Sequence, residues 1–180
     1  MFFKQLEGGY DYNFSYVIAD EETKDALIVD PFSDEILSII NKEKFKLQFL
    51  LNTHSHFDHM QGNKIILEKT KTKLIIPKDK QIIKLGKLKM QALFTPGHAP
   101  DHFCFLIENK LITGDLLFVG AIGGTGNFFK GSDEKEEFRS LAKILKLPDN
   151  TEIWPGHNYG SKKSSTIGHE KKTNPYLNTD

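Results

Sequence analysis

The chain has very little cysteine and no excess of charge of either sign. Among its 180 residues Cys104 is the only cysteine, so an internal disulfide is excluded. Cys104 lies in the apolar segment HFCFLI, where we expect it to act as a small buried hydrophobic residue. Lys plus Arg and Asp plus Glu are both 24, so no overall field attracts nucleic acid or an anionic membrane. We therefore expect neither a nucleic-acid nor a membrane partner, and the partner must be inferred from a site.

Long hydrophobic runs are also missing. Segments such as LLFVGAIGG fall far short of the roughly 20 apolar residues that a membrane helix needs. The N-terminal segment MFFKQLEGGYDYN becomes polar early and has no small-residue cleavage site, which predicts that no secretory signal is present. These features predict a cytoplasmic protein. The length and the absence of linkers and repeats predict one domain over residues 1–180.

The apolar pattern predicts alternating strands and helices in the first half and antiparallel hairpins in the second. Helices are expected at 33–44, 58–70 and 133–147. Strands are expected at 13–20, 25–30, 46–53, 73–77 and 151–155, and hairpins at 82–94 and 102–118. The polar tail from Ser161 gives no clear pattern. Together these elements predict a mixed α/β (α+β) fold in which two sheets pack together with helices outside.

The segment THSHFDHMQGN, residues 53–63, concentrates side chains of the types that bind metals. His54, His56, Asp58 and His59 fall within six consecutive positions. His54 and His56 are two residues apart after a predicted strand, so in an extended chain they project to the same side. Asp58 and His59 come where the next helix is expected to begin, and that turn can bring them to a second point nearby. We therefore expect the segment to serve two metal ions.

Three further candidates lie at the ends of predicted strands, each beside a glycine. They are His98 in TPGHAP, Asp115 in ITGDLLF and His157 in WPGHNYG. Loops at strand ends bring distant side chains to one ligand, and imidazole with carboxylate suits zinc and related divalent metals. Taken singly, each of the three is more often an ordinary loop or turn residue. His102 and His169 are expected to be strand-edge or surface histidines.

The order of these motifs resembles the metallo-β-lactamase superfamily over nearly the whole chain. NTHSHFDHMQGN, LFTPGHAPDHFCF, LITGDLLFVG and IWPGHNYG stand in that family's order. The resemblance implies a four-layer αββα sandwich with a metal site at one edge of its two sheets. It also implies two divalent metal ions, most simply zinc, with iron or manganese as alternatives. By this resemblance, His54, His56 and His98 bind the first ion, Asp58, His59 and His157 bind the second, and Asp115 bridges them.

Within the superfamily the chain most resembles the glyoxalase II (hydroxyacylglutathione hydrolase) and persulfide dioxygenase branch. This resemblance implies hydrolysis of a small thioester or ester by a metal-bridging hydroxide, with Asp58 and Asp115 as catalytic residues. The segment TGNFFKG lies where glyoxalase II has a Cys-Gly-basic segment ending in tyrosine. The expected substrate contacts are Asn127, Phe128, Phe129 and Tyr159.

Other functions stay open on the sequence alone. A mononuclear iron dioxygenase acting on a thiol persulfide would use His54, His98 and Asp115 as a triad of two histidines and one carboxylate. The segment at 164–177, SSTIGHEKKTNPYL, resembles the ending of that branch. A non-catalytic metal-binding module would hold an inert, fully loaded site. The balanced charge disfavours a nuclease, and no pattern indicates an oligomeric state.

Overall fold

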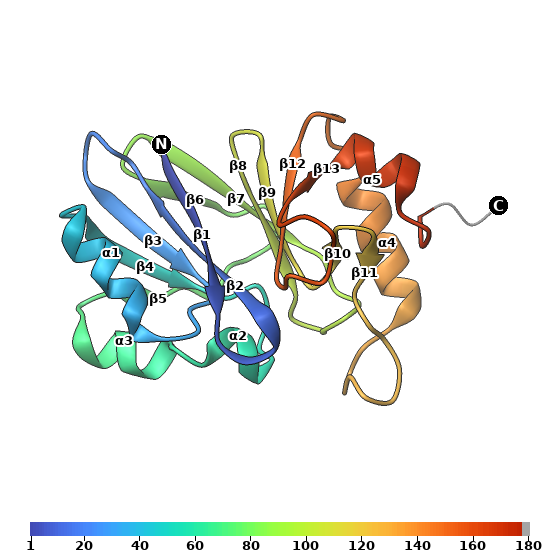
Figure 1. Cartoon of the computed structure of the whole chain (residues 1–180), viewed down its shortest axis with the longest axis horizontal. Helices are drawn as coiled ribbons and strands as arrows, with labels where there is room; N and C mark the ends of the chain where they lie inside the picture. Colours follow the sequence, from blue (N-terminus) through green and yellow to red (C-terminus); the bar gives the residue numbers. More distant parts are fainter. Residues whose placement is uncertain (178–180) are drawn as a thin grey trace.

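The computed structural model describes residues 1–177, which form two main β-sheets packed face to face (Figure 1). The first sheet has its strands in chain order: β1 (Phe2–Gly8), β2 (Asn13–Ala19), β3 (Asp25–Val29), β4 (Lys46–Leu51) and β5 (Lys73–Leu74). Strands β1 to β3 pair antiparallel, whereas β3, β4 and β5 pair parallel.

The second sheet combines two hairpins with strands from the end of the chain. Its spatial order is β13 (Ser165–Thr166), β12 (Glu152–Pro155), β9 (Lys110–Gly114), β8 (Phe103–Ile107), β7 (Leu88–Phe94) and β6 (Ile82–Leu85). The pair β12 and β9 is parallel and the others are antiparallel. A short ribbon of β10 (Leu117–Phe118) and β11 (Ala121–Ile122) follows β9.

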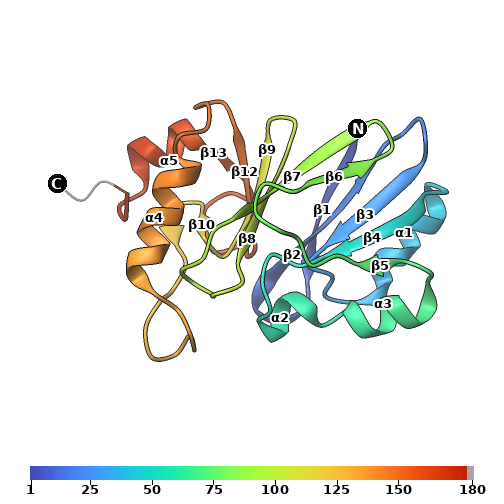
Figure 2. The same ribbon diagram turned by 180° about the vertical axis from the view of Figure 1, so that it is seen from behind.

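Helices cover the outer face of each sheet, as the reverse view in Figure 2 also shows. Against the first sheet lie α1 (Leu37–Lys42), which continues a 3-10 turn η2 (Asp34–Ile36), and α3 (Asn63–Lys69). Against the second sheet lie α4 (Glu134–Ile144) and α5 (Ile167–Thr173). Two short elements, η1 (Tyr10–Tyr12) and α2 (Phe57–Met60), lie in loops. None of the helices within residues 1–177 has the length and apolar character needed to cross a bilayer.

Three apolar clusters hold these layers together and confirm the predicted αββα sandwich. One lies between the sheets and joins Phe14 and Tyr16 of β2 to Phe105 of β8. The second packs α1 and α3 on the first sheet, and the third packs α4 and α5 on the second sheet. Cys104 belongs to the third cluster and is fully buried, as expected. Burial also raises the pKa of its thiol to about 12, as befits a structural cysteine.

The helix predicted at 58–70 is wrong in one respect, because it is divided into α2 and α3 at Gln61 and Gly62. The N–H of Gly62 donates to the carbonyl of Pro31 at 2.7 Å instead of to the preceding helical turn. A Cβ atom at Gly62 would lie 2.8 Å from that same carbonyl oxygen. The close approach of the Pro31 backbone therefore requires glycine here and ends the short helix that carries Asp58 and His59.

Three other predictions of secondary structure need correction. Strand β1 was not expected, because an edge strand is half exposed on both faces and its residues lack a clear apolar alternation. The strand predicted at 73–77 shortens to Lys73–Leu74. Helix α5 forms in the tail that gave no pattern, where the Thr166 hydroxyl caps it by accepting from the N–H of His169.

Candidate metal centre

The loops that follow β4, β7, β9 and β12 meet at one edge of the two sheets. There the seven sequence-predicted metal ligands come together in three overlapping groups, and within each group the ligand atoms lie within 4.8 Å of one another. The first group is His54, His56 and His98, and the second group is Asp58, His59 and His157. The remaining group, His54, His59 and Asp115, joins the first to the second. The structure therefore brings together the seven residues that the sequence motifs indicated. The ligand role of each residue stays a prediction.

The first group consists of three imidazoles whose nitrogens converge. His54 Nε2 lies 2.9 Å from His56 Nδ1, and His98 Nε2 lies 3.0 Å from the same atom. His54 and His98 are buried, whereas His56 is half exposed at the mouth of the site. Three ring nitrogens this close, contributed by two separate loops, form a donor set suited to zinc, iron or manganese.

The second group combines one carboxylate with two imidazoles. Asp58 Oδ2 lies 3.2 Å from His157 Nε2 and 3.4 Å from His59 Nε2, and the two Nε2 atoms are 3.2 Å apart. The amide of Asn13 donates to the same Asp58 oxygen at 3.1 Å. This group also joins loops of both sheets, because His157 follows β12 of the second sheet.

Asp115 lies between the two groups. Its Oδ1 is 3.3 Å from His59 Nε2, and its Oδ2 is 3.3 Å from His157 Nε2 and 3.6 Å from His98 Nε2. Within residues 1–177, Oδ1 is buried without a hydrogen bond of good geometry, so its lone pairs are free to bind a cation. The carboxylate thus contacts both the first and the second group.

A hydrogen-bond acceptor fixes the other nitrogen of three of the histidines. Nδ1 of His59 donates to Asp30 Oδ2 at 2.9 Å, Nδ1 of His98 to the Gly124 carbonyl at 2.7 Å, and Nδ1 of His157 to the Asp11 carbonyl at 2.8 Å. Because these oxygens accept, Nδ1 carries a hydrogen and Nε2 is the nitrogen that faces the site. This arrangement is the usual support for metal-binding histidines.

The carboxylates make the site one that stabilises positive charge. Burial alone would lower the pKa of His157, but hydrogen bonds to Asp115 and Asp58 outweigh burial and raise that pKa to about 10. Burial likewise opposes the charged form of Asp58, yet His157, His59 and Asn13 bring its pKa down to about 2. A site with these preferences is suited to divalent cations, which can take the place of the imidazolium protons.

Burial has the opposite consequence in the first group. It lowers the pKa of His54 well below the ordinary value, with nearby His59 acting in the same direction, and it lowers the pKa of His98. Both rings are therefore held neutral, which is the form of histidine that binds metals.

Two supporting residues were missed by the sequence analysis. Asp30, which has a left-handed backbone after β3, is buried and accepts from both the N–H and the hydroxyl of Thr53 as well as from His59. The second supporting residue is His102, for which the sequence predicts a strand-edge or surface position. The surface position is wrong, because the His102 side chain is fully buried beside His54. Its Nε2 accepts from the N–H of Asp115 at 3.2 Å. His169 is exposed, as expected.

The expected substrate contacts differ in their relation to the histidines. The ring of Phe129 lies 4.8 Å from that of His98, and the ring of Tyr159 stacks on that of His157 at 4.7 Å. Asn127 is exposed, and Phe128 is 98% exposed, so Phe128 lies in solvent rather than over the metal-ligand candidates. Phe129 therefore lies beside the first group, at His98, and Tyr159 lies beside the second group, at His157.

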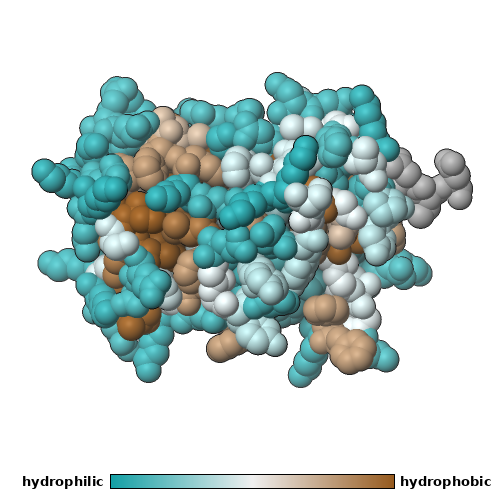
Figure 3. Space-filling view, viewed as in Figure 1, coloured by the Kyte–Doolittle hydropathy of each residue, from teal (hydrophilic) through white to brown (hydrophobic). Residues whose placement is uncertain are grey.

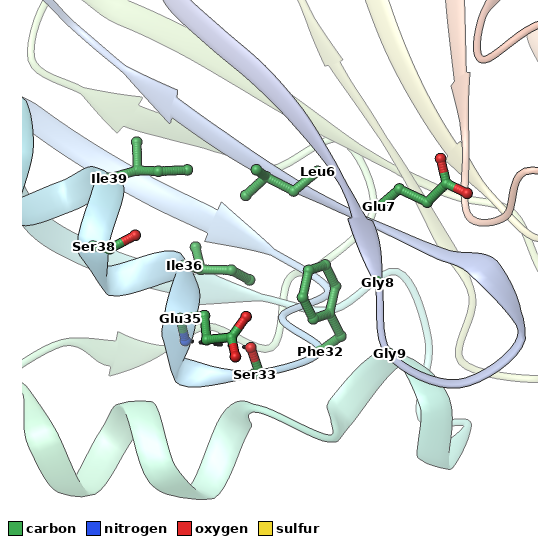
Figure 4. A pocket seen from close by; sticks show the side chains of 10 residues that line it. All are labelled: Leu6, Glu7, Gly8, Gly9, Phe32, Ser33, Glu35, Ile36, Ser38 and Ile39. Atoms are coloured by element: carbon green, nitrogen blue, oxygen red, sulfur yellow. Dashed lines mark hydrogen bonds between the residues drawn. The ribbon is translucent and has the colours of Figure 1, made fainter.

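A hollow lined by both apolar and polar residues lies elsewhere on the molecule, between β1 and α1, where Figure 3 shows hydrophobic surface. Leu6, Phe32 and Ile36 point into it (Figure 4). None of the residues that line it is a metal-ligand candidate. The hollow therefore plays no part in the assignment of the metal centre.

Comparison with known proteins agrees with the fold and with the order of the motifs. A family model described as the metallo-beta-lactamase superfamily matches residues 8–93, a range that includes His54 to His59. A probable hydroxyacylglutathione hydrolase, glo2, of Schizosaccharomyces pombe is 34% identical over 88% of this chain and 70% of its own length. A hydroxyacylglutathione hydrolase of Dictyostelium discoideum is 32% identical over 83% of this chain and 63% of its own length.

Solved structures extend the likeness to the second half of the chain. The structure of ETHE1 from Myxococcus xanthus is 28% identical with a TM-score of 0.92, and the match covers 98% of this chain and 84% of that one. The BLEG-1 B3 metallo-beta-lactamase is 25% identical with a TM-score of 0.88, over 99% of this chain and 100% of that one. The chain thus spans about two thirds of the two hydroxyacylglutathione hydrolases, 84% of the ETHE1 structure and all of the BLEG-1 structure. Sequence, fold and the converging histidines together show that the chain belongs to the metallo-β-lactamase superfamily, among its glyoxalase II-like hydrolases.

Proposed function

We propose that the chain is a binuclear metal-dependent hydrolase of a small thioester or ester. The observation that carries this proposal is the position of Asp115, whose carboxylate lies within 3.6 Å of His98 in one group and within 3.3 Å of His59 and His157 in the other. A carboxylate shared by two groups of three ligands suits two metal ions better than one. Zinc is the metal we favour, with iron or manganese as alternatives.

We assign each candidate ligand to one of the two ions, or to both. His54, His56 and His98 would hold one ion, and Asp58, His59 and His157 the other, with Asp115 between them. Two divalent ions held by these residues would supply a water molecule with a lowered pKa and a Lewis acid for the developing oxyanion. Asp58, which is oriented by the Asn13 amide, would accept a hydrogen bond from the attacking water. A thiolate leaving group needs little protonation, so no separate strong acid is required.

The substrate class we favour is a small acyl thioester. Relatives that bear the name hydroxyacylglutathione hydrolase support a hydroxyacyl thioester as the first compound to test. Phe129 and Tyr159 would flank the substrate, with Asn127 and Phe128 as outer contacts. Asn127 and Phe129 replace a basic residue and a tyrosine in the glutathione contacts implied by the glyoxalase II resemblance. A smaller thiol carrier should therefore be accepted as well as glutathione. The cytoplasmic location and the single domain over residues 1–180 stay predictions.

A mononuclear iron dioxygenase is the second candidate, because His54 and Asp115 share one ligand group and His98 lies 3.6 Å from Asp115. It leaves His56, Asp58, His59 and His157 without a ligand role, although the last three form a group of their own. The two candidates differ in the reaction, since only the dioxygenase consumes oxygen with a glutathione persulfide.

The experiment compares hydrolysis of a 2-hydroxyacyl glutathione thioester with oxygen uptake on glutathione persulfide, in wild type and in Asp115→Ala. We expect thioester hydrolysis by wild type and a loss of more than about 10²-fold in Asp115→Ala, together with loss of bound metal. Asp101→Ala, at an exposed position near the site, serves as the control and should retain both. Full hydrolysis with two metals bound in Asp115→Ala, or oxygen uptake without hydrolysis in wild type, would contradict the proposal.

A further inference from the structure

Helix α4 carries a buried carboxyl group that the proposed reaction does not use. Glu137 is 1% exposed, and within residues 1–177 neither of its oxygens makes a hydrogen bond of good geometry. Burial raises the pKa of this carboxyl to about 8. Leu141 and Ile144, one and two turns later on the same helix, belong to an apolar cluster. A carboxyl group buried without a well-formed hydrogen bond costs free energy that an apolar side chain would not. A carboxyl group at this position therefore indicates that its polar atoms have a function.

The two oxygens of Glu137 lie against two different loops. A Cβ atom built at Gly97 would come within 2.3 Å of Glu137 Oε2, and one built at Gly123 within 2.8 Å of Oε1. Gly97 has φ +150°, and the absence of a side chain lets the carboxyl approach the backbone. The backbone N–H groups of His98 and Gly123 counteract the effect of burial on the pKa of Glu137. The Gly123 N–H also donates to the Leu116 carbonyl at 3.3 Å.

The same two loops determine the position of His98. The first loop supplies its backbone, and the second supplies the Gly124 carbonyl that accepts from its Nδ1 at 2.7 Å. Helix α4 already holds the first loop at two points, since Asp133 N–H donates to the Gly97 carbonyl at 2.8 Å and Ser140 Oγ to the Pro96 carbonyl at 2.6 Å. Glu137 lies between these two anchors in the sequence and also reaches the second loop.

We propose that Glu137 is a positioning residue, whose carboxyl joins the backbones of His98 and Gly123 and thereby holds the His98 imidazole in place for the first metal ion. This inference rests on the proposed role of His98 as a ligand. The carboxyl acts through His98 and touches neither substrate nor metal. Replacing a residue that orients a metal ligand in this way typically lowers the metal affinity about 10–100-fold.

The test measures zinc affinity at each of the two sites by competition with a chromophoric chelator, and thermal unfolding of the chelator-treated protein. In Glu137→Leu we expect an unchanged or higher unfolding temperature, a first-site affinity about 10–100-fold weaker and a second site within about twofold of wild type. Glu137→Gln keeps one acceptor oxygen and nearly the same shape, so its first-site affinity should be intermediate. Glu134→Gln, one turn earlier at an exposed position, should bind both ions as wild type does.

The outcomes separate this inference from the proposed function. Wild type with two zinc ions, and Glu137 variants that bind both equally well, would overturn the inference and leave the function standing. A lower unfolding temperature with equal weakening of both sites would also overturn it, because that pattern marks a merely structural residue. If Glu137→Leu does not fold, Glu137→Gln decides by the same comparison of the two sites. Wild type that binds no second ion would overturn the proposed function itself.

Discussion

At the scale of single residues, the orientation of each imidazole depends on the acceptor at its Nδ1. His59 relies on Asp30, which also accepts both hydrogen bonds from Thr53 and so fixes the loop that carries His54. Burial would lower the pKa of His59, but the carboxylates of Asp115 and Asp30 raise it well above the ordinary value. Asp30 is therefore expected to increase the basicity of His59 as a ligand.

Asp30→Asn tests this support. The amide has nearly the same shape but no charge, so we expect the second metal site to weaken about 10–100-fold while the first changes much less. Chelator competition with zinc measures both affinities. Asp34→Asn, which removes a carboxylate of η2 that pairs with Lys69 outside the site, should leave both unchanged. Equal affinities in Asp30→Asn and wild type would contradict the assigned role.

The low pKa of the buried His102 predicts that the free energy of unfolding depends on pH. Burial lowers its pKa to about 3 in the folded chain, against about 6.5 for an unfolded histidine. Between these values only the unfolded chain binds the proton, so this residue makes the free energy of unfolding fall as the pH falls from 6.5 toward 3. The slope from one such group approaches about 1.4 kcal/mol per pH unit.

The measurement is urea unfolding of chelator-treated protein at several pH values between 4 and 7. His102→Gln can still accept from the N–H of Asp115 but does not titrate, so we expect its stability to fall less steeply with acid than that of wild type. The exposed variant His169→Gln should follow the wild-type curve. Parallel curves for His102→Gln and wild type would show that His102 is not held neutral.

At the scale of elements, the site depends on where short helices stop. Gly62 ends the helical bonding after α2 because its N–H binds the Pro31 carbonyl, and this contact fixes the turn that carries Asp58 and His59. In Gly62→Ala the new Cβ would lie 2.8 Å from the Pro31 oxygen, so the two segments must separate. We expect a loss of about 1–3 kcal/mol in the free energy of unfolding.

Urea unfolding checks this value. Glu68→Ala in α3 is the matched control, since it removes only an exposed ion pair with Lys64 and should change stability by less than about 0.5 kcal/mol. A Gly62→Ala variant as stable as the control would mean that the Pro31 contact does not determine the break between α2 and α3.

The sequence predicted the elements whose apolar pattern is regular, such as the hairpins at 82–94 and 102–118 and the helix at 133–147. It also predicted which seven residues meet, because histidine and aspartate beside strand ends reveal their chemistry without knowledge of contacts. It missed Asp30, whose partner His59 lies 29 positions later, and Glu137, whose proposed partners His98 and Gly123 lie 39 and 14 positions earlier. Such long-range support leaves no local pattern.

At the scale of the whole molecule, the metal centre requires both sheets. The loop from His54 to His59 follows the first sheet, whereas His98, Asp115 and His157 follow strands of the second. Direct contacts tie the sheets together at this edge: Asn13 pairs with His157 in an isolated bridge, and the Tyr16 hydroxyl donates to the Pro155 carbonyl. Metal binding at the proposed site would therefore be coupled to the packing of the two halves, and we expect bound metal to stabilise the whole fold.

The most direct test of the central claim is the metal content of wild-type protein purified without chelators or added metal, measured by elemental analysis. The account predicts close to two equivalents per chain, as zinc or as a mixture with iron or manganese. About one equivalent, all of it iron, would contradict the binuclear site and favour the dioxygenase, and Asp58, His59 and His157 would then need another explanation.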